Sequence, residues 1–488
     1  MHFDLETITS ALEREGLLVR INGNLPQSFD AIADDSRQVK NRSLFIAVKG
    51  SVRDGHDFLA RAAELGASAA MVEDASRTSL PTIVVREGRK AAATAAAAAF
   101  GDPSHELRMI GITGTNGKST TAGILRHLLD RPGSRAASIG TLGVLFGSDA
   151  EVVPGGSELT TPGPVELQRV LRELVNRGVK TVAMEVSSHS LDQRRIDGLS
   201  FDAAVFTNLT RDHLDYHGTM ENYFAAKARL MDYLKPDGTA AVNIDDRNWE
   251  VLPDSRRKIP FGISARAKVR GTDVEFSPRG SRWNLHYGGA QAHVTLPLIG
   301  DVNVHNALGA AAVGITFGLS LDEIAKSLAH LPQVPGRLEV ISQDPTVLRD
   351  YAHTPDAIER ALAAIRPFTS GRLILVFGCG GDRDRGKRSE MGRAAQAGAD
   401  LVIVTNDNPR TEDPEQILDD IEKGMTPGRH ERITKRKAAI QRALDEARNG
   451  DVVLLAGKGH ETYQIIGTTK LPFDEKAIVR ELLAGSAA

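Results

Sequence analysis

Short apolar runs alternate with stretches of helical spacing near the N-terminus. The predicted strands are 43–48, 69–72 and 81–85, and the predicted helices are 57–65 and 90–100. Strands that alternate with helices in this way are typical of βαβ units. The pattern predicts a small α/β domain that ends at the turn-forming sequence Gly-Asp-Pro-Ser at 101–104.

The same alternation continues in two further blocks. Apolar runs at 180–186 and 201–207 predict buried parallel strands, whereas 269–297 alternates apolar and polar residues as antiparallel strands do. The strands expected in the third block are 372–377, 401–405 and 451–456. Because 488 residues exceed what one hydrophobic core usually serves, we expect several domains. Their predicted bounds are 1–104, 105–335 and 336–488.

Composition and charge narrow the class of protein. The 60 basic and 63 acidic residues give a formal charge of -3, so nothing favours nucleic acid or an anionic membrane as a partner. The single cysteine, Cys379, excludes an intrachain disulfide and favours a reducing compartment. The N-terminus has no signal-peptide pattern, and no run reaches the roughly 18 apolar residues of a spanning helix. We therefore expect a cytoplasmic protein without membrane insertion.

The stretch 109–121 joins an apolar strand to a glycine loop, a lysine and several hydroxyls. Glycines let backbone N–H groups surround phosphate oxygens, Lys118 adds a positive charge, and Ser119 opens a helix whose N-terminus favours an anion. The loop departs from G-x-x-x-x-G-K-[ST], because Ile112 stands where the first glycine would fall. The pattern predicts a nucleoside triphosphate site; a plain turn between strand and helix is the alternative.

Two later segments carry side chains that suit a metal ion. Glu185 ends an apolar strand, where an acidic residue can hold magnesium beside ATP, although a structural ion pair is an alternative. His213 and His217 lie four apart, but Leu214 stands where a zinc protease needs glutamate. A loop that merely turns the chain with Asp and His side chains also stays open.

Lys227 interrupts an apolar stripe on a helix predicted over 220–234 and capped by Thr219. The apolar members of the stripe are Met220, Tyr223, Phe224, Leu230, Met231 and Leu234. Such a lysine usually extends to solvent or pairs with a carboxylate. The alternative is that burial deprotonates the amine, which then takes up carbon dioxide and becomes a carbamate able to face magnesium.

Several motifs occur in order along the chain. They are Gly-Thr-Asn-Gly-Lys at 114–118, Glu-Val-Ser-Ser-His at 185–189, Asn-Leu-Thr-Arg-Asp-His at 208–213, Lys227, Asp-Tyr-Ala-His-Thr-Pro at 350–355, Gly-Cys-Gly-Gly-Asp-Arg-Asp at 378–384, Asp-Asn-Pro-Arg at 407–410 and Gly-Lys-Gly-His-Glu at 457–461. Together they resemble the Mur ligases over all three blocks. The resemblance implies an α/β protein of three domains: a small N-terminal α/β domain, a central P-loop-type ATPase domain with a mainly parallel sheet, and a C-terminal Rossmann-like α/β domain.

The resemblance also implies roles for residues in every block. ATP would bind Gly114, Thr115, Asn116, Gly117, Lys118, Ser119 and Thr120, together with Asn306, Arg337, Asp350 and His353. Magnesium would be held by Ser119, Glu185, His213 and the carbamate of Lys227, and the catalytic set would be Lys118, Glu185, His213 and Lys227. A UDP-N-acetylmuramoyl dipeptide would bind Ser36 and Ser51 through its nucleotide, and Thr160, Thr161, Ser187, Gln193 and Arg195 through its peptide. The incoming amino acid would bind Arg383, Asp407, Asn408, Pro409, Arg410, Gly457 and Glu461.

The implied reaction is an amide ligation in peptidoglycan precursor synthesis. ATP would transfer its γ-phosphoryl to the γ-carboxylate of D-glutamate, and an amine would then displace phosphate from the acyl phosphate. Arg410 suits a bidentate grip on the second carboxylate of meso-2,6-diaminopimelate, which L-lysine lacks. The alternatives are the same ligase acting on L-lysine and a ligase like folylpolyglutamate synthetase. We expect a monomer whose partners are small molecules.

Overall fold

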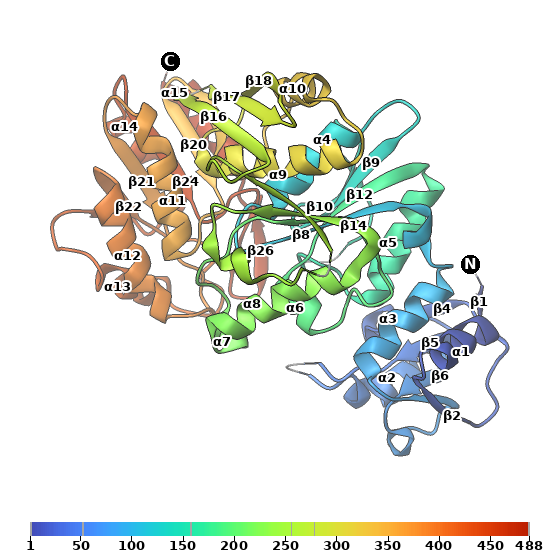
Figure 1. Ribbon diagram of the computed structural model, residues 1–488. Coiled ribbons are helices and arrows are strands. Elements are labelled where there is room, and N and C mark those ends of the chain that lie inside the picture. The colour runs from blue at the N-terminus through green and yellow to red at the C-terminus, as the bar shows by residue number, and fades with distance from the viewer. Residues whose placement is uncertain (1, 51–52, 157–158, 255, 278, 487–488) are drawn as a thin grey trace. The chain divides into compact units, whose positions relative to one another are not determined.

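The computed structural model describes residues 2–50, 53–156, 159–254, 256–277 and 279–486. The chain forms two compact units, each discontinuous in sequence. The first unit consists of Met1–Phe261 and Ala312–Gly318, and the second of Gly262–Ala311 and Leu319–Ala488. Figure 1 labels many of the helices and strands of both.

The first unit begins with a five-stranded sheet of order β2-β7-β6-β5-β4. Its strands are β2 (Leu18–Asn22), β4 (Ala31–Ala33), β5 (Ser43–Ile46), β6 (Ala67–Val72) and β7 (Thr82–Val85). Strands β4 to β7 are parallel, and β2 joins the edge antiparallel. The helices of this part are α1 (Leu5–Arg14), α2 (Leu59–Glu64) and α3 (Gly88–Ala99). The small α/β fold expected at the N-terminus is therefore present.

A second sheet of the first unit carries the predicted phosphate loop. The strands that this unit contributes to the sheet, in spatial order, are β11 (Glu151–Val153), β10 (Gly143–Phe146), β9 (Arg135–Gly140), β12 (Val179–Glu185), β8 (Arg108–Thr113), β13 (Phe201–Phe206), β14 (Leu234–Asn243) and β15 (Arg257–Gly262). The strands from β9 to β15 in this order are parallel, and β10 and β11 extend the edge antiparallel. The register sets Glu185 opposite Ile112 and Phe206 opposite Thr113. The carboxyl ends of β8, β12 and β13 therefore coincide, and ligands of parallel sheets bind at this edge.

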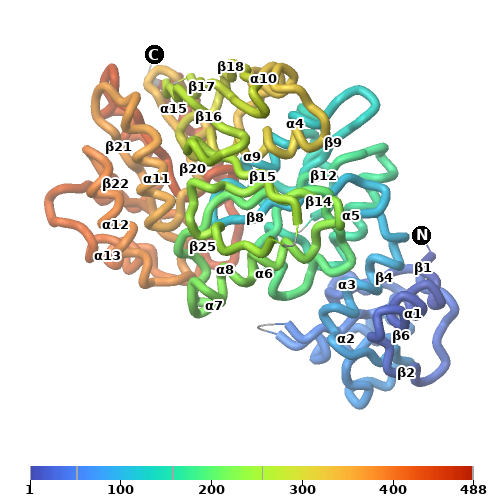
Figure 2. Tube along the Cα trace, viewed as in Figure 1, coloured from blue at the N-terminus to red at the C-terminus, as the bar shows by residue number. Residues whose placement is uncertain are grey.

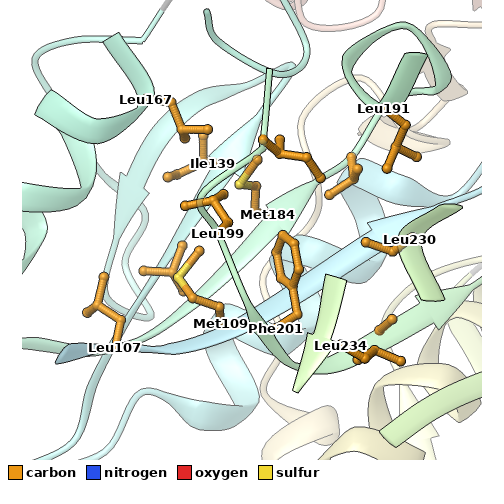
Figure 3. Packing of buried hydrophobic residues seen from close by; sticks show 14 of the residues in the cluster. Leu107, Met109, Ile139, Leu167, Met184, Leu191, Leu199, Phe201, Leu230 and Leu234 are labelled. Carbon is orange, nitrogen blue, oxygen red and sulfur yellow. The ribbon is translucent and has the colours of Figure 1, made fainter. Parts of the chain in front are cut away.

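Buried apolar side chains hold these strands at a fixed register. Figure 3 shows Met109, Ile139, Met184 and Phe201, which come from four neighbouring strands, packed close to one another. All four are almost fully buried, and burying such a side chain contributes about 1.5–3 kcal/mol. The helices that follow the strands are α4 (Lys118–Leu129), α5 (Pro164–Asn176), α6 (Ser188–Asp192), α7 (Leu214–His217) and α8 (Met220–Ala228). A rigid sheet edge thus carries the loops of the candidate site.

The second unit contains three antiparallel strands and a mainly parallel sheet. The antiparallel strands are β16 (Val269–Ser277), β17 (Gly280–Tyr287) and β18 (Ala290–Leu296). The other sheet, in spatial order, has β19 (Glu339–Gln343), β20 (Thr346–Asp350), β24 (Val452–Ala456), β21 (Leu373–Phe377), β22 (Leu401–Val404) and β23 (Glu431–Arg432). Only the β19–β20 pair of this sheet is antiparallel.

The remaining elements of this unit are mostly helices. They are α10 (Leu321–Ala329), α11 (Pro355–Ile365), α12 (Gly386–Gly398), α13 (Pro414–Glu422), α14 (Arg436–Glu446) and α15 (Glu475–Ser486), with a hairpin of β25 (Tyr463–Ile466) and β26 (Thr469–Pro472). Helix α9 (Asp301–Thr316) belongs to this unit as far as Ala311 and to the first unit from Ala312. Helices α11 and α12, both orange, lie side by side in Figures 1 and 2. The α/β fold class predicted from the sequence is confirmed.

One predicted helix is wrong in length. The helix expected over 220–234 is α-helical only as far as Ala228. A 3-10 helix, Arg229–Tyr233, follows it, and Leu234 begins β14. Leu230 and Met231 are buried on this 3-10 turn, so their apolar spacing does not distinguish the two helical forms.

Within the part of the chain that the structure describes, no helix combines the length and the apolar composition needed to cross a membrane.

Candidate active site

The glycines of the predicted phosphate loop permit a backbone path that other residues would block. Gly114 has φ +142° and Gly117 has φ +86°, values that suit glycine. A Cβ at Gly114 would lie 1.9 Å from the hydroxyl oxygen of Thr207, at the end of β13. The loop therefore packs directly against the neighbouring strand, and this contact requires glycine.

Hydrogen bonds from the segment after β13 fix the shape of this loop. The Thr115 amide donates to the Asn208 carbonyl at 2.7 Å, and the Asn116 amide donates to Asn208 Oδ1 at 3.0 Å. In return, the Thr207 hydroxyl donates to the Asn116 carbonyl at 2.7 Å. The motif at 208–213 thus supports the phosphate loop through the side chain and backbone of Asn208.

Two lysines approach one carbonyl of the loop. Lys118 Nζ donates to the carbonyl oxygens of Gly114 and Thr115 at 2.8 and 2.7 Å. Lys227 Nζ, on α8, also donates to the Gly114 carbonyl, at 2.7 Å. The sequence does not reveal this meeting, because Lys227 lies 113 positions from Gly114.

Lys227 neither reaches solvent nor joins an ion pair in the described residues. Its side chain is 1% exposed, and its Nζ lies 4.6 Å from the centre of the Tyr223 ring. Burial, reinforced by the charge of Lys118, holds the pKa of Lys227 well below its ordinary value. The site therefore favours the neutral amine, which is the nucleophilic form.

Glu185 is buried at the end of β12 without a basic partner among the described residues. Its side chain accepts hydrogen bonds from the Thr141 amide at 2.9 Å and the Thr141 hydroxyl at 3.3 Å. Only 2% of the residue is exposed. The structural ion pair considered from the sequence is thus not seen there, and the carboxylate is held by neutral donors.

His213 belongs to a group of rings beside the phosphate loop. Its ring centre lies 4.7 Å from that of His189, and His189 also packs against Tyr216 at 4.3 Å. Burial lowers the pKa of His213, and the charge of Lys118 lowers it further. These two predicted side chains therefore lie within electrostatic range of each other. The sequence pattern did not indicate a role for His189, whose pKa burial lowers to about 4.

The described residues contain no group of three or more His, Cys, Asp or Glu side chains arranged to hold a metal ion. The predicted magnesium residues include only two of those types, Glu185 and His213. A metal held by the predicted set would therefore need further oxygens from Ser119 and from a modified Lys227.

The residues predicted for the peptide arm are connected to each other and to Glu185. The Thr161 hydroxyl donates to the Glu185 carbonyl at 2.9 Å and accepts from the Ser187 amide at 3.1 Å. Arg195 donates to the Thr161 carbonyl at 3.1 Å and to the side-chain oxygen of Gln193 at 2.6 Å. Polar side chains thus line one continuous patch beside the end of β12.

Other predicted residues of the first unit have simpler surroundings. The Thr160 hydroxyl accepts from the Thr141 hydroxyl at 3.2 Å. Ser36 begins the 3-10 helix Ser36–Gln38, and Ser51 lies outside the described residues. Ser187 also caps α6, as its hydroxyl accepts from the Ser190 amide at 3.1 Å.

The remaining residues predicted for ATP lie in the second unit. The partly buried Asp350 carboxylate accepts from the amides of Leu338 at 2.7 Å and Ala352 at 2.8 Å. Burial raises the pKa of Asp350. Arg337 lies over the Tyr351 ring at 4.9 Å, and His353 Nδ1 is 2.7 Å from the Tyr351 carbonyl. Asn306 is buried in α9, where its side chain donates to Asn303 at 3.2 Å.

Residues predicted for the amino acid meet where β22 and β24 end. Asn408 Nδ2 donates to Glu461 Oε2 at 2.8 Å. A Cβ at Gly457 would lie 2.4 Å from Asp407 Oδ2, so Gly457 allows the Asp407 carboxylate to approach. Lys458, for which the sequence pattern did not indicate a role, is also buried in this group.

Arg410 and Arg383 differ in how firmly they are held. Arg410 has φ 52° and donates through Nη1 to the Gly381 carbonyl at 2.8 Å. Gly381 is packed so closely that a Cβ on it would lie 1.9 Å from the Pro409 carbonyl oxygen. Arg383 is exposed and donates to the Asp382 carbonyl at 3.2 Å.

Three family models match the chain. Residues 29–111 match the catalytic domain of the Mur ligase family, 112–314 match the Mur ligase middle domain, and 336–459 match the glutamate ligase domain of Mur ligases.

Relatives are similar over almost their whole length. The UDP-N-acetylmuramoyl-L-alanyl-D-glutamate–2,6-diaminopimelate ligase of Geobacter sulfurreducens is 44% identical, covering 94% of this chain and 95% of the relative. The ligase of the same name from Geobacillus thermodenitrificans is 42% identical and covers 98% of both chains. A solved structure of a ligase with this name has a TM-score of 0.68 and 33% identity, and covers 100% of both chains.

Proposed function

Because the chain belongs to the Mur ligase family, we propose that it is an ATP-dependent ligase that adds meso-2,6-diaminopimelate to UDP-N-acetylmuramoyl-L-alanyl-D-glutamate. The bond would form at the γ-carboxylate of D-glutamate. The observation that carries the proposal is the nearly full-length match to relatives named for this reaction. Those relatives match all three blocks of the chain. A ligase like folylpolyglutamate synthetase does not require the first block, because it has no UDP group to bind.

The phosphate loop supports the ATP-dependent step. A carboxylate is a poor electrophile, so the γ-phosphoryl of ATP must first move to it and form an acyl phosphate. Lys118 is held against the loop by its hydrogen bonds to the Gly114 and Thr115 carbonyls. Its positive charge would offset the negative charge on the phosphoryl group during the transfer. The amine of the amino acid then attacks the acyl carbon, the C–O bond to phosphate breaks, and the amide forms.

We propose that magnesium is held by Ser119, Glu185, His213 and a carbamate on Lys227. Carboxylate, hydroxyl and carbamate oxygens are hard donors of the kind that Mg²⁺ prefers. When bound, the ion would stabilise the negative charge of the phosphates. ATP is a co-substrate in this scheme.

The carbamate proposal rests on the environment of Lys227. Its buried amine has a lowered pKa, and a neutral amine can attack carbon dioxide. A C–N bond forms, the nitrogen loses a proton, and the side chain becomes an anion. Because Lys118 and Lys227 both contact the Gly114 carbonyl, the anion would offset the positive charge of Lys118.

For the amino acid, we propose Arg410 as the group that binds the distal carboxylate of diaminopimelate, with Arg383, Asp407, Asn408, Pro409, Gly457 and Glu461 around it. The contact of Arg410 with Gly381 limits the freedom of its side chain, so less entropy is lost on binding. L-lysine has no distal carboxylate and would leave the guanidinium without this partner.

We propose the same three functional blocks as domains, with bounds at 1–104, 105–335 and 336–488. They would bind the UDP-sugar, ATP and the amino acid respectively. Small molecules are the partners in this scheme, and a monomer in the cytoplasm is consistent with substrates of this kind.

The reaction itself can be tested directly. The protein is incubated with ATP, MgCl₂, the UDP-muramoyl dipeptide, and either meso-diaminopimelate or L-lysine. We expect phosphate release and a product of the ligated mass with meso-diaminopimelate. Release with L-lysine alone would support the lysine alternative, and no release with either amine would contradict the ligase proposal.

A further inference from the structure

Lys458 is a fully buried lysine among the residues proposed to bind the amino acid. It directly follows Gly457, after the end of β24, and its side chain is 0% exposed. Burying an ammonium group is costly unless it is paired and hydrogen-bonded. Its contacts therefore indicate what the fold gains from a lysine at this position.

Lys458 joins two segments of the amino-acid site. Its Nζ donates to Asn408 Oδ1 at 3.1 Å and to Glu461 Oε2 at 3.2 Å. The Asp407 Oδ1 atom is 3.7 Å away. One ammonium group thus offsets the charges of the Asp407 and Glu461 carboxylates and also contacts Asn408, in the segment after β22.

The contact with Lys458 fixes the orientation of the Asn408 amide. Asn408 Oδ1 accepts from Lys458 and also from the backbone amide of Ile465, at 2.9 Å. A flipped amide would turn its own N–H groups toward both donors. Asn408 Nδ2 is therefore directed at Glu461 Oε2, to which it donates at 2.8 Å.

These contacts also determine which oxygen of Glu461 is available. Oε2 accepts from both Asn408 and Lys458. Among the described residues, none donates a hydrogen bond to Oε1. The Glu461 side chain is 17% exposed, so a ligand can reach it. A cationic group of a ligand would find Oε1 oriented and free.

We propose that Lys458 is a positioning residue for the amino-acid site: it orients Asn408 and Glu461 so that Glu461 Oε1 accepts from the distal ammonium of the substrate. This inference rests on the proposed function. Lys458 acts through these two side chains and does not itself contact the substrate. Its charge also keeps Asp407 and Glu461 from repelling each other.

The test compares KM values of purified full-length variants. We expect Lys458→Met to raise KM for meso-diaminopimelate by about tenfold or more, because an ordered charged acceptor is lost. KM for ATP and for the UDP-muramoyl dipeptide should stay within about twofold, and kcat at saturating amine should change little. A merely structural defect would affect all three substrates.

Lys437→Met is the matched control. Lys437 is half-exposed on α14 and pairs with Glu481 at 2.9 Å. The same chemical change there should leave all KM values unchanged. If it reproduces the effect of Lys458→Met, the inference is wrong.

A double variant tests whether Lys458 acts through Glu461. We expect Lys458→Met/Glu461→Gln to have the same KM for meso-diaminopimelate as Glu461→Gln alone, since coupled residues are not additive. A further tenfold rise in the double variant would contradict the inference. If Lys458→Met alone does not fold, the double variant can still be measured. It lacks the Glu461 carboxylate, which Lys458→Met alone would leave without its ammonium partner.

The outcomes separate this inference from the proposed function. Wild-type protein that releases no phosphate in response to meso-diaminopimelate contradicts the proposed function. An active wild type with an unchanged KM in Lys458→Met contradicts only the role of Lys458.

Discussion

At the scale of single residues, Lys227 is the side chain whose chemistry depends most on its surroundings. We expect Lys227→Ala to lower kcat by at least about a hundredfold, because it removes an anion proposed to face the metal. Added acetate or formate should restore part of the rate, since a small carboxylate can fill the space and carry the charge. Phosphate release measured with and without these anions checks both effects.

Lys235→Ala provides the comparison for Lys227. Lys235 also lies in the first unit but is partly exposed and pairs with Asp202 at 2.8 Å. It should keep the wild-type rate and show no response to acetate. A Lys227→Ala variant with full activity would argue against any role for a carbamate.

Arg410 determines the choice of amino acid in the proposed function. Loss of a charge-assisted hydrogen bond costs about 2 kcal/mol, or about thirtyfold in affinity. We expect Arg410→Ala to raise KM for meso-diaminopimelate by this order while leaving KM for ATP unchanged. The preference over L-lysine, measured as a ratio of kcat/KM values, should fall by a similar factor. Arg429→Ala, at an exposed site of the same unit, should change neither, and an unaltered preference in Arg410→Ala would refute the assignment.

At the scale of elements, a buried ion pair joins the last helix, α15, to α14 within the second unit. Arg436 on α14 and Glu475 at the start of α15 are both fully buried and lie 2.7 Å apart. Arg436 also donates to the Ala456 carbonyl at 2.8 Å, at the end of β24. Breaking such a pair from one side leaves an uncompensated buried charge and costs about 3–5 kcal/mol.

Urea unfolding measures how much this ion pair stabilises the protein. We expect Arg436→Met to lower the free energy of unfolding by about 3–5 kcal/mol. Lys437→Met, at the next position but in an exposed pair, should cost no more than about 1 kcal/mol. Equal, small losses in the two variants would show that the buried pair does not hold α15 in place.

The elements themselves followed closely from the pattern of apolar residues. Strands predicted at 372–377, 401–405 and 451–456 correspond to β21, β22 and β24, because buried parallel strands give continuous apolar runs. The helix predicted over 220–234 was too long, because burial of Leu230 and Met231 is compatible with either an α- or a 3-10 helix.

At the scale of the whole molecule, the proposed reaction requires both a nucleotide and a divalent cation. We expect EDTA to abolish phosphate release and excess MgCl₂ to restore it. A non-hydrolysable ATP analogue with Mg²⁺, at a hundred times its Kd, should stabilise the fold by about 2.7 kcal/mol. The melting temperature, followed by fluorimetry with and without the analogue, checks this. Full activity in EDTA would contradict the proposed need for magnesium.

The sequence by itself determined the α/β class and the set of motifs typical of a Mur ligase, and it predicted the phosphate loop, since each rests on local spacing and composition. The tertiary structure alone decided which distant side chains meet. Lys227 reaches Gly114 across 113 positions, and Lys458 reaches Asn408 across 50. Such contacts depend on strand order and register, which bring the carboxyl ends of separate strands together. Local pattern contains no information about that order, so a buried lysine's partner, and with it the lysine's chemistry, appears only in the folded chain.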